Sequence, residues 1–169
     1  KAQFQIIEET FAKYNKVRVK SSDLKKASAT IEEKKALLQD LQTQYQNLAD
    51  YQSFEWIVAA VYRIADLYAE FAQMIYKVPE PKGLDDEELD MYITQIEDLG
   101  LQFENQAIQR YEQAVAQSRR FKVTNEWSKR ALVAINKFKP DDYPLFKEEK
   151  YQTVFEPTYT LDNRAPKGR

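Results

Sequence analysis

The sequence predicts an all-α fold of antiparallel helical hairpins stacked on one another, with one long helix pair and an extended C-terminal tail. Apolar residues recur every three or four positions through most of the first 140 residues, which is the period of amphipathic helices. Glycine and proline are scarce, and apart from Gly100 they fall only in residues 79–83 and after residue 139. Because so few residues interrupt the periodic segments, we expect long helices. We assign residues 1–150 to one helical domain and residues 151–169 to the tail.

The first expected helix covers residues 2–18 and is amphipathic. Its apolar face consists of Phe4, Ile7, Phe11, Tyr14 and Val17. Residues 21–23 then break the pattern, and their side-chain oxygens suit the first N–H groups of a new helix. Because the chain begins with Lys1 and not with methionine, we expect it to be a fragment of a longer protein.

The second expected helix covers residues 24–52, and Lys34 and Lys35 break its apolar seam. The seam consists of Leu24, Ala27, Ile31, Leu38, Leu41, Tyr45, Leu48 and Tyr51. Two short heptad blocks suit either a helix packed on one side or the arm of a coiled-coil hairpin, and the absence of four clean heptads favours the packed helix. In the alternative, the chain would self-associate through Ile31, Leu38, Leu41 and Tyr45.

We expect residues 55–78 to form the central helix, because they hold the longest apolar run in the chain. One apolar face consists of Ile57, Val61, Ile64, Tyr68, Phe71 and Ile75, and a second consists of Trp56, Ala60, Leu67 and Met74. A helix that is apolar on two faces packs between neighbours. Charges at Arg63, Asp66, Glu70 and Lys77 leave it without the roughly 20 uninterrupted apolar residues of a membrane span.

Two further helices follow the PEPKG segment at residues 79–83. Asp85 and Glu88 form a capping-box pattern before a long helix that runs to about Phe121. Gly100 lies in the middle of that helix, where it suits a kink or a close helix crossing. Thr124 or Asn125 is expected to cap a last helix over residues 126–138.

The chain changes character at Tyr151, after which it has no helical period and is rich in Thr, Tyr and Pro. We expect an extended tail that docks through Val154, Phe155 and Tyr159 onto the helical body or a neighbouring molecule. A flexible terminus is the alternative.

The composition excludes several kinds of site. The chain has no cysteine and no histidine. Disulfides, Cys/His zinc sites and Ser-His-Asp triads are therefore excluded, and we expect neither an enzyme nor a cofactor. The formal net charge of −2 gives no general reason to expect a nucleic-acid partner.

Two clusters of charge remain to be explained. The first consists of the nine acids between Glu80 and Glu104, against Lys82 alone. A solvated helix start fits these acids better than a calcium or magnesium site, because carboxylates at successive helix positions diverge around the axis. The second consists of Arg119, Arg120, Lys122, Lys129 and Arg130. We expect it to pair with the acidic stretch or with a partner protein rather than with nucleic acid.

An internal repeat relates the starts of two expected helices. The pattern Glu55-Trp56-x-x-x-Ala60-Val61-x-x-Ile64 matches Glu126-Trp127-x-x-x-Ala131-Leu132-x-x-Ile135. Repeats of this kind indicate stacked helical hairpins, in which each unit buries its apolar face on the next. We therefore expect Trp56 and Trp127 to lie in the core.

Around this repeat the chain resembles a tetratricopeptide repeat (TPR) protein. Val61-x-x-Ile64-Ala65-x-x-Tyr68 is similar to the first helix of that repeat, and Ala107-x-x-x-Tyr111-x-x-Ala114-Val115 is similar to its second helix. The resemblance covers about half of the chain, and residues 79–106 enlarge the unit beyond the usual length of about 34 residues. It implies a TPR-like array that binds a protein or peptide segment in a groove.

A narrower resemblance concerns YRIADLYAEFAQ, PEPKGLDDEEL and NEWSKRALVAINKFKPDDYPLFKEE. These segments are similar to the C-terminal part of large TPR proteins of deltaproteobacteria, some of which belong to the gliding-motility machinery of the cell envelope. The resemblance implies a non-enzymatic scaffold segment of a bacterial multiprotein complex, and favours the periplasmic side of the envelope over the cytoplasm.

The expected partners are a protein or peptide segment, or neighbouring repeats of the parent chain, and not nucleic acid or an inserted membrane span. Three tyrosines, Tyr62, Tyr76 and Tyr92, fall off the best apolar stripes and are candidates for the contact surface. Phe155 and Tyr159 of the tail complete the set of candidate binding residues.

Overall fold

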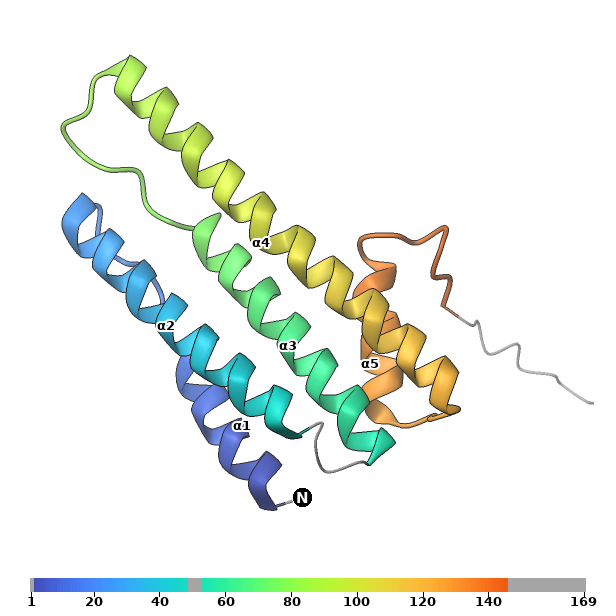
Figure 1. Cartoon of the computed structure of the whole chain (residues 1–169). Coiled ribbons are helices and arrows are strands. Elements are labelled where there is room, and N and C mark those ends of the chain that lie inside the picture. Colours follow the sequence, from blue (N-terminus) through green and yellow to red (C-terminus); the bar gives the residue numbers. More distant parts are fainter. Residues whose placement is uncertain (1, 49–52, 146–169) are drawn as a thin grey trace, which may run out of the picture.

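The computed structural model describes residues 2–48 and 53–145, and over these ranges the chain is all-α (Figure 1). The helices are α1 (Ala2–Tyr14), α2 (Leu24–Leu48), α3 (Phe54–Ile75), α4 (Asp86–Phe121) and α5 (Glu126–Asn136). The all-α part of the predicted fold class is confirmed, and successive helices run antiparallel. The predicted tail lies outside the described residues, so its docking through Phe155 and Tyr159 stays a prediction.

Helix α3 is the centre of the fold, as its two apolar faces predict. It packs against α2, α4 and α5, and Figure 1 shows it lying between α2 and α4. Ile64 in its middle is 4 % exposed and Ile75 at its end is fully buried. Because neighbours surround α3, removing volume from its side chains leaves cavities that few groups can relax to fill.

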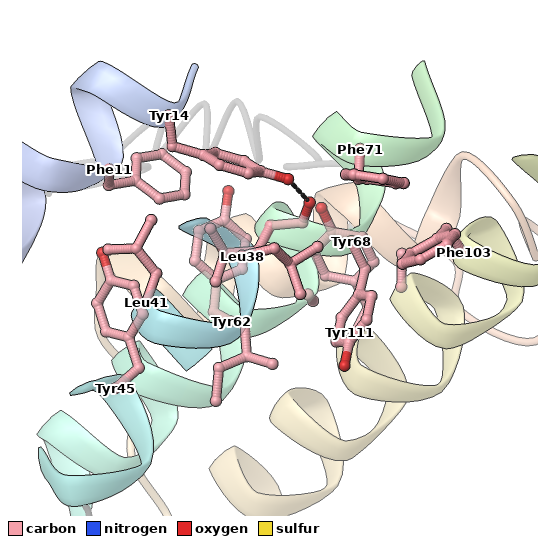
Figure 2. Close-up of a cluster of buried hydrophobic side chains, with 14 of the residues drawn as sticks. Phe11, Tyr14, Leu38, Leu41, Tyr45, Tyr62, Tyr68, Phe71, Phe103 and Tyr111 are labelled. Atoms are coloured by element: carbon pink, nitrogen blue, oxygen red, sulfur yellow. Dashed lines mark hydrogen bonds between the residues drawn. The ribbon is translucent and has the colours of Figure 1, made fainter. Parts of the chain in front are cut away.

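Helix α1 joins this centre through its side chains. The Tyr14 hydroxyl donates to the Leu67 carbonyl oxygen at 2.6 Å, the bond drawn in Figure 2. The ring of Phe4 lies 5.0 Å from that of Trp56 and 5.3 Å from that of Trp127. The two tryptophans of the internal repeat therefore meet at one phenylalanine, and both pack against the core as expected.

The seam of α2 is continuous, so the predicted break at Lys34 is wrong. Its buried or half-buried positions follow alternating steps of three and four, and consist of Ala27, Ile31, Lys34, Leu38, Leu41, Tyr45 and Leu48. Lys34 is fully buried, and its Nζ donates to the Val17 carbonyl oxygen at 3.3 Å above the ring of Tyr14. The four-carbon stem fills a core position while the ammonium reaches a carbonyl, so a lysine can continue an apolar seam.

The same burial decides between the two interpretations of this helix. Leu38 is 2 % exposed, and Leu41 and Tyr45 are fully buried inside the chain. These side chains are not available to a second copy. The structure therefore favours the packed helix, because three of the four residues of the alternative are buried and only Ile31 is half-buried.

Lys34 is expected to make stability rise with pH. Burial, with a smaller effect of Arg18, lowers the pKa of Lys34 to about 8 from 10.5, against the opposing charge of Glu70. Between these values the Lys34 side chain binds more protons in the unfolded chain, so this residue alone contributes an increase of about 2 kcal/mol in the free energy of unfolding from pH 8 to pH 10. Lys34→Met should lack this increase in urea titrations across that range. Parallel pH profiles for the two proteins would contradict the assignment.

The ends of the helices follow local chemistry. The predicted capping box is present, because Asp85 accepts from the Glu88 amide at 2.9 Å and Glu88 accepts from the Asp85 amide at 3.2 Å. Asn125 caps α5 in a second box with Ser128. Helix α1 ends at Tyr14, earlier than expected, and the N–H groups of Lys16 and Val17 close its last turn by donating to carbonyls three residues back.

Candidate functional site

A groove opens between α2 and α4 beyond the end of α3. Tyr76, just past the end of α3, lies against Gly100 of α4. Residues 86–99, the first four turns or so of α4, come before that contact. Figure 1 shows that α2 and α4 both extend past α3 on this side. We call the space between them the α2–α4 groove. It is lined by Leu24, Ala27, Ser28, Ile31, Glu32, Tyr92, Gln95, Ile96 and Leu99.

Each wall of the α2–α4 groove is an apolar stripe at helical spacing. Leu24, Ala27 and Ile31 form the stripe on α2, and Leu24 is 45 % exposed. Tyr92, Ile96 and Leu99 form the stripe on α4. The groove has a volume of about 380 Å³. Helix α3 ends at Ile75, before this space. No part of α3 therefore lies between these two stripes, as it does between α2 and α4 along the rest of their length.

Two of the candidate tyrosines come together beside this groove. Tyr76 and Tyr92 line an adjoining hollow of about 210 Å³, which also takes in Ile96 and Glu97. Tyr76 is 44 % exposed, and Tyr92 belongs to both hollows. Desolvation raises the pKa of both phenols. The structure thus places this predicted pair on one accessible surface.

Gly100 allows the ring of Tyr76 to lie against the backbone of α4. A Cβ at Gly100 would stand 2.3 Å from Tyr76 Cε1. Helix α4 is continuous through Gly100, and the group that lies against the glycine is the side chain of Tyr76 rather than the backbone of a crossing helix.

We expect Gly100→Ala to show its effect only together with Tyr76. In a Tyr76→Ala background the change should stabilise by about 1 kcal/mol, because alanine is the better helix former. With Tyr76 present, the ring must move from the new methyl group, and the gain should vanish or reverse. Urea unfolding of the four proteins measures this coupling. Equal gains in both backgrounds would show that the ring does not rest on the glycine.

The position of Tyr62 differs from the prediction. Tyr62 is 9 % exposed, and its ring lies 5.9 Å from that of Tyr111 and 5.8 Å from that of Trp127. It lies on the side of α3 that α5 covers, so the inference that it falls off the packed faces is wrong. Burial raises its pKa to about 12. It still reaches the floor of a second groove, which is lined by Glu126, Lys129, Arg130, Val133, Ala134 and Lys137.

The acidic and basic clusters lie at opposite ends of α4. Among the described residues, no acid from Glu80 to Glu104 forms an ion pair. Arg119 instead faces the ring of Tyr143, and Arg130 pairs with Glu126. The expected pairing of the two clusters inside the chain is therefore wrong. Within residues 2–48 and 53–145, the acids that line the α2–α4 groove and the adjoining hollow form no ion pair.

A separate network of ionisable groups lies in the centre of the fold, and its contacts reach all five described helices. Arg63 binds both oxygens of Glu8 and donates to Asp66 at 3.0 Å. Tyr45 donates to Glu8 at 2.6 Å and Tyr111 donates to Asp66 at 2.7 Å. The guanidinium also lies between two rings, 4.6 Å from Phe11 and 4.9 Å from Trp127.

This central network has the character of a structural element. Burial raises the pKa of the Asp66 carboxyl, while bonds from Tyr111 and Arg63 oppose that rise. Shifted groups in a cleft often mark active sites, but here the donors and acceptors bind one another and come from four packed helices, while α5 contributes the ring of Trp127. The network thus fixes how α1, α2, α4 and α5 meet α3.

Sequence reasoning missed the groove stripes as a possible site. Leu24 and Ile31 belong to the predicted seam of residues 24–52, and Ile96 and Leu99 have the same spacing of three to four residues on the long helix, which is the spacing of any core-facing stripe. The signal that was available is length. The expected helix of residues 55–78 is much shorter than the expected helix from residue 86 to about Phe121. If the two pack side by side, part of the longer helix extends past the shorter one.

Comparison with family models, curated proteins and solved structures gives no match for this chain. Within the described ranges, none of the helices has both the length and the apolar character needed to cross a membrane. The same residues contain no group of three or more acidic side chains placed to hold a metal ion.

Proposed function

We propose that this chain is a non-enzymatic protein-binding module of a larger scaffold, and that the α2–α4 groove is its binding surface. The observation that carries the proposal is the pair of apolar stripes with no helix between them. Apolar stripes left open on an otherwise well-packed domain are typical of interaction sites. Tyr76 and Tyr92 beside the stripes add aromatic area, which is favoured at protein interfaces.

The order of helix contacts supports a TPR-like arrangement within this proposal. Each helix packs on the next, and α3 also packs on α5. Ala60 and Ile64 of α3 are buried, as are their repeat partners Ala131 and Ile135 of α5. Such nearest-neighbour stacking is the organisation of helical repeats. Because the chain resembles deltaproteobacterial TPR proteins of the cell envelope, we propose that the module belongs to a bacterial envelope complex.

The proposal is tested by affinity capture from cell extract, with partners identified by mass spectrometry. Three baits are compared: the wild-type chain, the groove variant Ile96→Glu and the control variant Leu101→Glu. Leu101 is 51 % exposed on the same helix and does not line the groove, so its variant carries the same added charge elsewhere. A protein retained by wild type and Leu101→Glu but lost with Ile96→Glu supports the function. Identical captures with all three folded baits would overturn it.

A further inference from the structure

We propose that the occupant of the α2–α4 groove is a short basic amphipathic helix of a partner protein. This inference rests on the proposed function and specifies the partner.

The first step concerns the backbone form of the occupant. Over the rest of its length the space between α2 and α4 is filled by a helix, α3. The groove lies beyond the end of α3, between the same two helices, so a second helix can lie there with similar spacing. Helical walls offer side chains and no free strand edge, which suits an amphipathic helix rather than an added β-strand.

The second step concerns the size and apolar face of the occupant. The stripe from Leu24 to Ile31 and the stripe from Tyr92 to Leu99 each cover about two turns, or about 10 Å. A helix of two to three turns with apolar residues at steps of three and four would place a side chain between the stripes at each turn. The volume of about 380 Å³ suits several such side chains.

The third step concerns charge. The described residues that line the groove and the adjoining hollow include acids but no lysine or arginine. Glu32 lies in the lining of the α2 wall, and Glu80 and Glu97 line the adjoining hollow. None of these acids has an ion-pair partner among the described residues. Lysines or arginines flanking the apolar face of the occupant would be attracted to them.

The same charges argue against a second copy of this chain docked symmetrically. In a two-fold arrangement the acidic end of one copy would face the acidic end of the other, and like charges in an interface cost binding energy. A head-to-tail contact with the basic end around Lys129 and Lys137 avoids this repulsion. The experiment below distinguishes that contact from the proposed partner.

The test uses a synthetic probe and the whole chain. The probe is a capped 16-residue peptide with leucines at helical steps of three and four and lysine and alanine elsewhere. One control peptide has the same composition in scrambled order, and another replaces every lysine with glutamate. Fluorescence anisotropy of labelled peptides measures binding to the wild type, Ile96→Glu and Leu101→Glu. Circular dichroism confirms that the three proteins are equally folded.

We expect the amphipathic lysine peptide to bind the wild type at least about tenfold more tightly than either control peptide, and Ile96→Glu to lose at least about tenfold, since a carboxylate would face an apolar contact. Leu101→Glu should keep wild-type affinity. Amide chemical-shift changes should concentrate in residues 24–32 and 92–99. Equal binding of the scrambled peptide, or of the glutamate peptide, would overturn the proposal, as would unchanged affinity of Ile96→Glu.

Two results separate this inference from the proposed function. If no peptide binds but affinity capture still loses a protein with Ile96→Glu, the function stands and the partner chemistry is wrong. If sedimentation equilibrium shows a mass that rises with concentration, and Ile96→Glu abolishes the rise, the occupant is a second copy and the proposed partner is overturned.

Discussion

Replacing Arg63 with alanine is expected to lower the free energy of unfolding by about 3–5 kcal/mol, because it leaves the carboxylates of Glu8 and Asp66, which are only 26 % and 17 % exposed, without their cation. Arg63 binds Glu8 with two nitrogens and Asp66 with a third, and its side chain is 14 % exposed. The loss would reach beyond the ion pairs, since the guanidinium also packs between the rings of Phe11 and Trp127. Urea unfolding followed by circular dichroism measures the change.

Two comparisons make this prediction specific. Arg63→Lys should restore little of the stability, because an ammonium cannot make the two-nitrogen contact with Glu8. Arg18→Ala removes a similar cation from an ion pair with Glu70 in which the side chains are 41 % and 30 % exposed. It should cost no more than about 1 kcal/mol, since solvent screens exposed pairs. A loss of that size for Arg63→Ala would show that the network does not hold the helices together.

The helical framework was predictable because its signals are local. The capping box of Asp85 and Glu88 and the two apolar faces of α3 need only neighbours within one or two turns. The burial of Lys34 was not predicted, because a lysine is usually exposed and this one is fully buried. Its spacing belongs to the seam, and only the tertiary contacts with Val17 and Tyr14 show that a lysine fills that position.

The candidate site was less predictable, because it depends on which apolar stripes have no third helix packed between them. Ile96 and Ile64 look alike in sequence, yet Ile96 is half-buried and lines the groove, while Ile64 is 4 % exposed in the core. Tyr62 shows the reverse error, since α5 covers a position that seemed free. The charge pairing failed for reasons of distance. Asp98 and Arg119 are separated by about 30 Å of helix, several times the screening length of about 8 Å at physiological salt.

The aromatic contact between α3 and α4 should be the other major determinant of stability. Phe71 is fully buried, and its ring centroid lies 4.3 Å from that of Phe103 (Figure 2). Phe71→Ala is expected to cost about 3–5 kcal/mol, because a large cavity would open where α3 is packed between its neighbours. The midpoint of urea unfolding should fall accordingly, with little change in its slope.

Phe54 provides a matched control on the same helix. It also stacks on a phenylalanine of α4, Phe121, with ring centroids 4.3 Å apart, but it is 52 % exposed. Phe54→Ala removes the same atoms from a half-solvated pair, so the loss should stay near the 0.5–1.5 kcal/mol of an aromatic contact, about a third of that at Phe71. Equal losses at the two positions would mean that stacking, and not enclosure of α3, sets the stability of the helix pair. A small loss at both would show that α3 is not the enclosed centre of the fold.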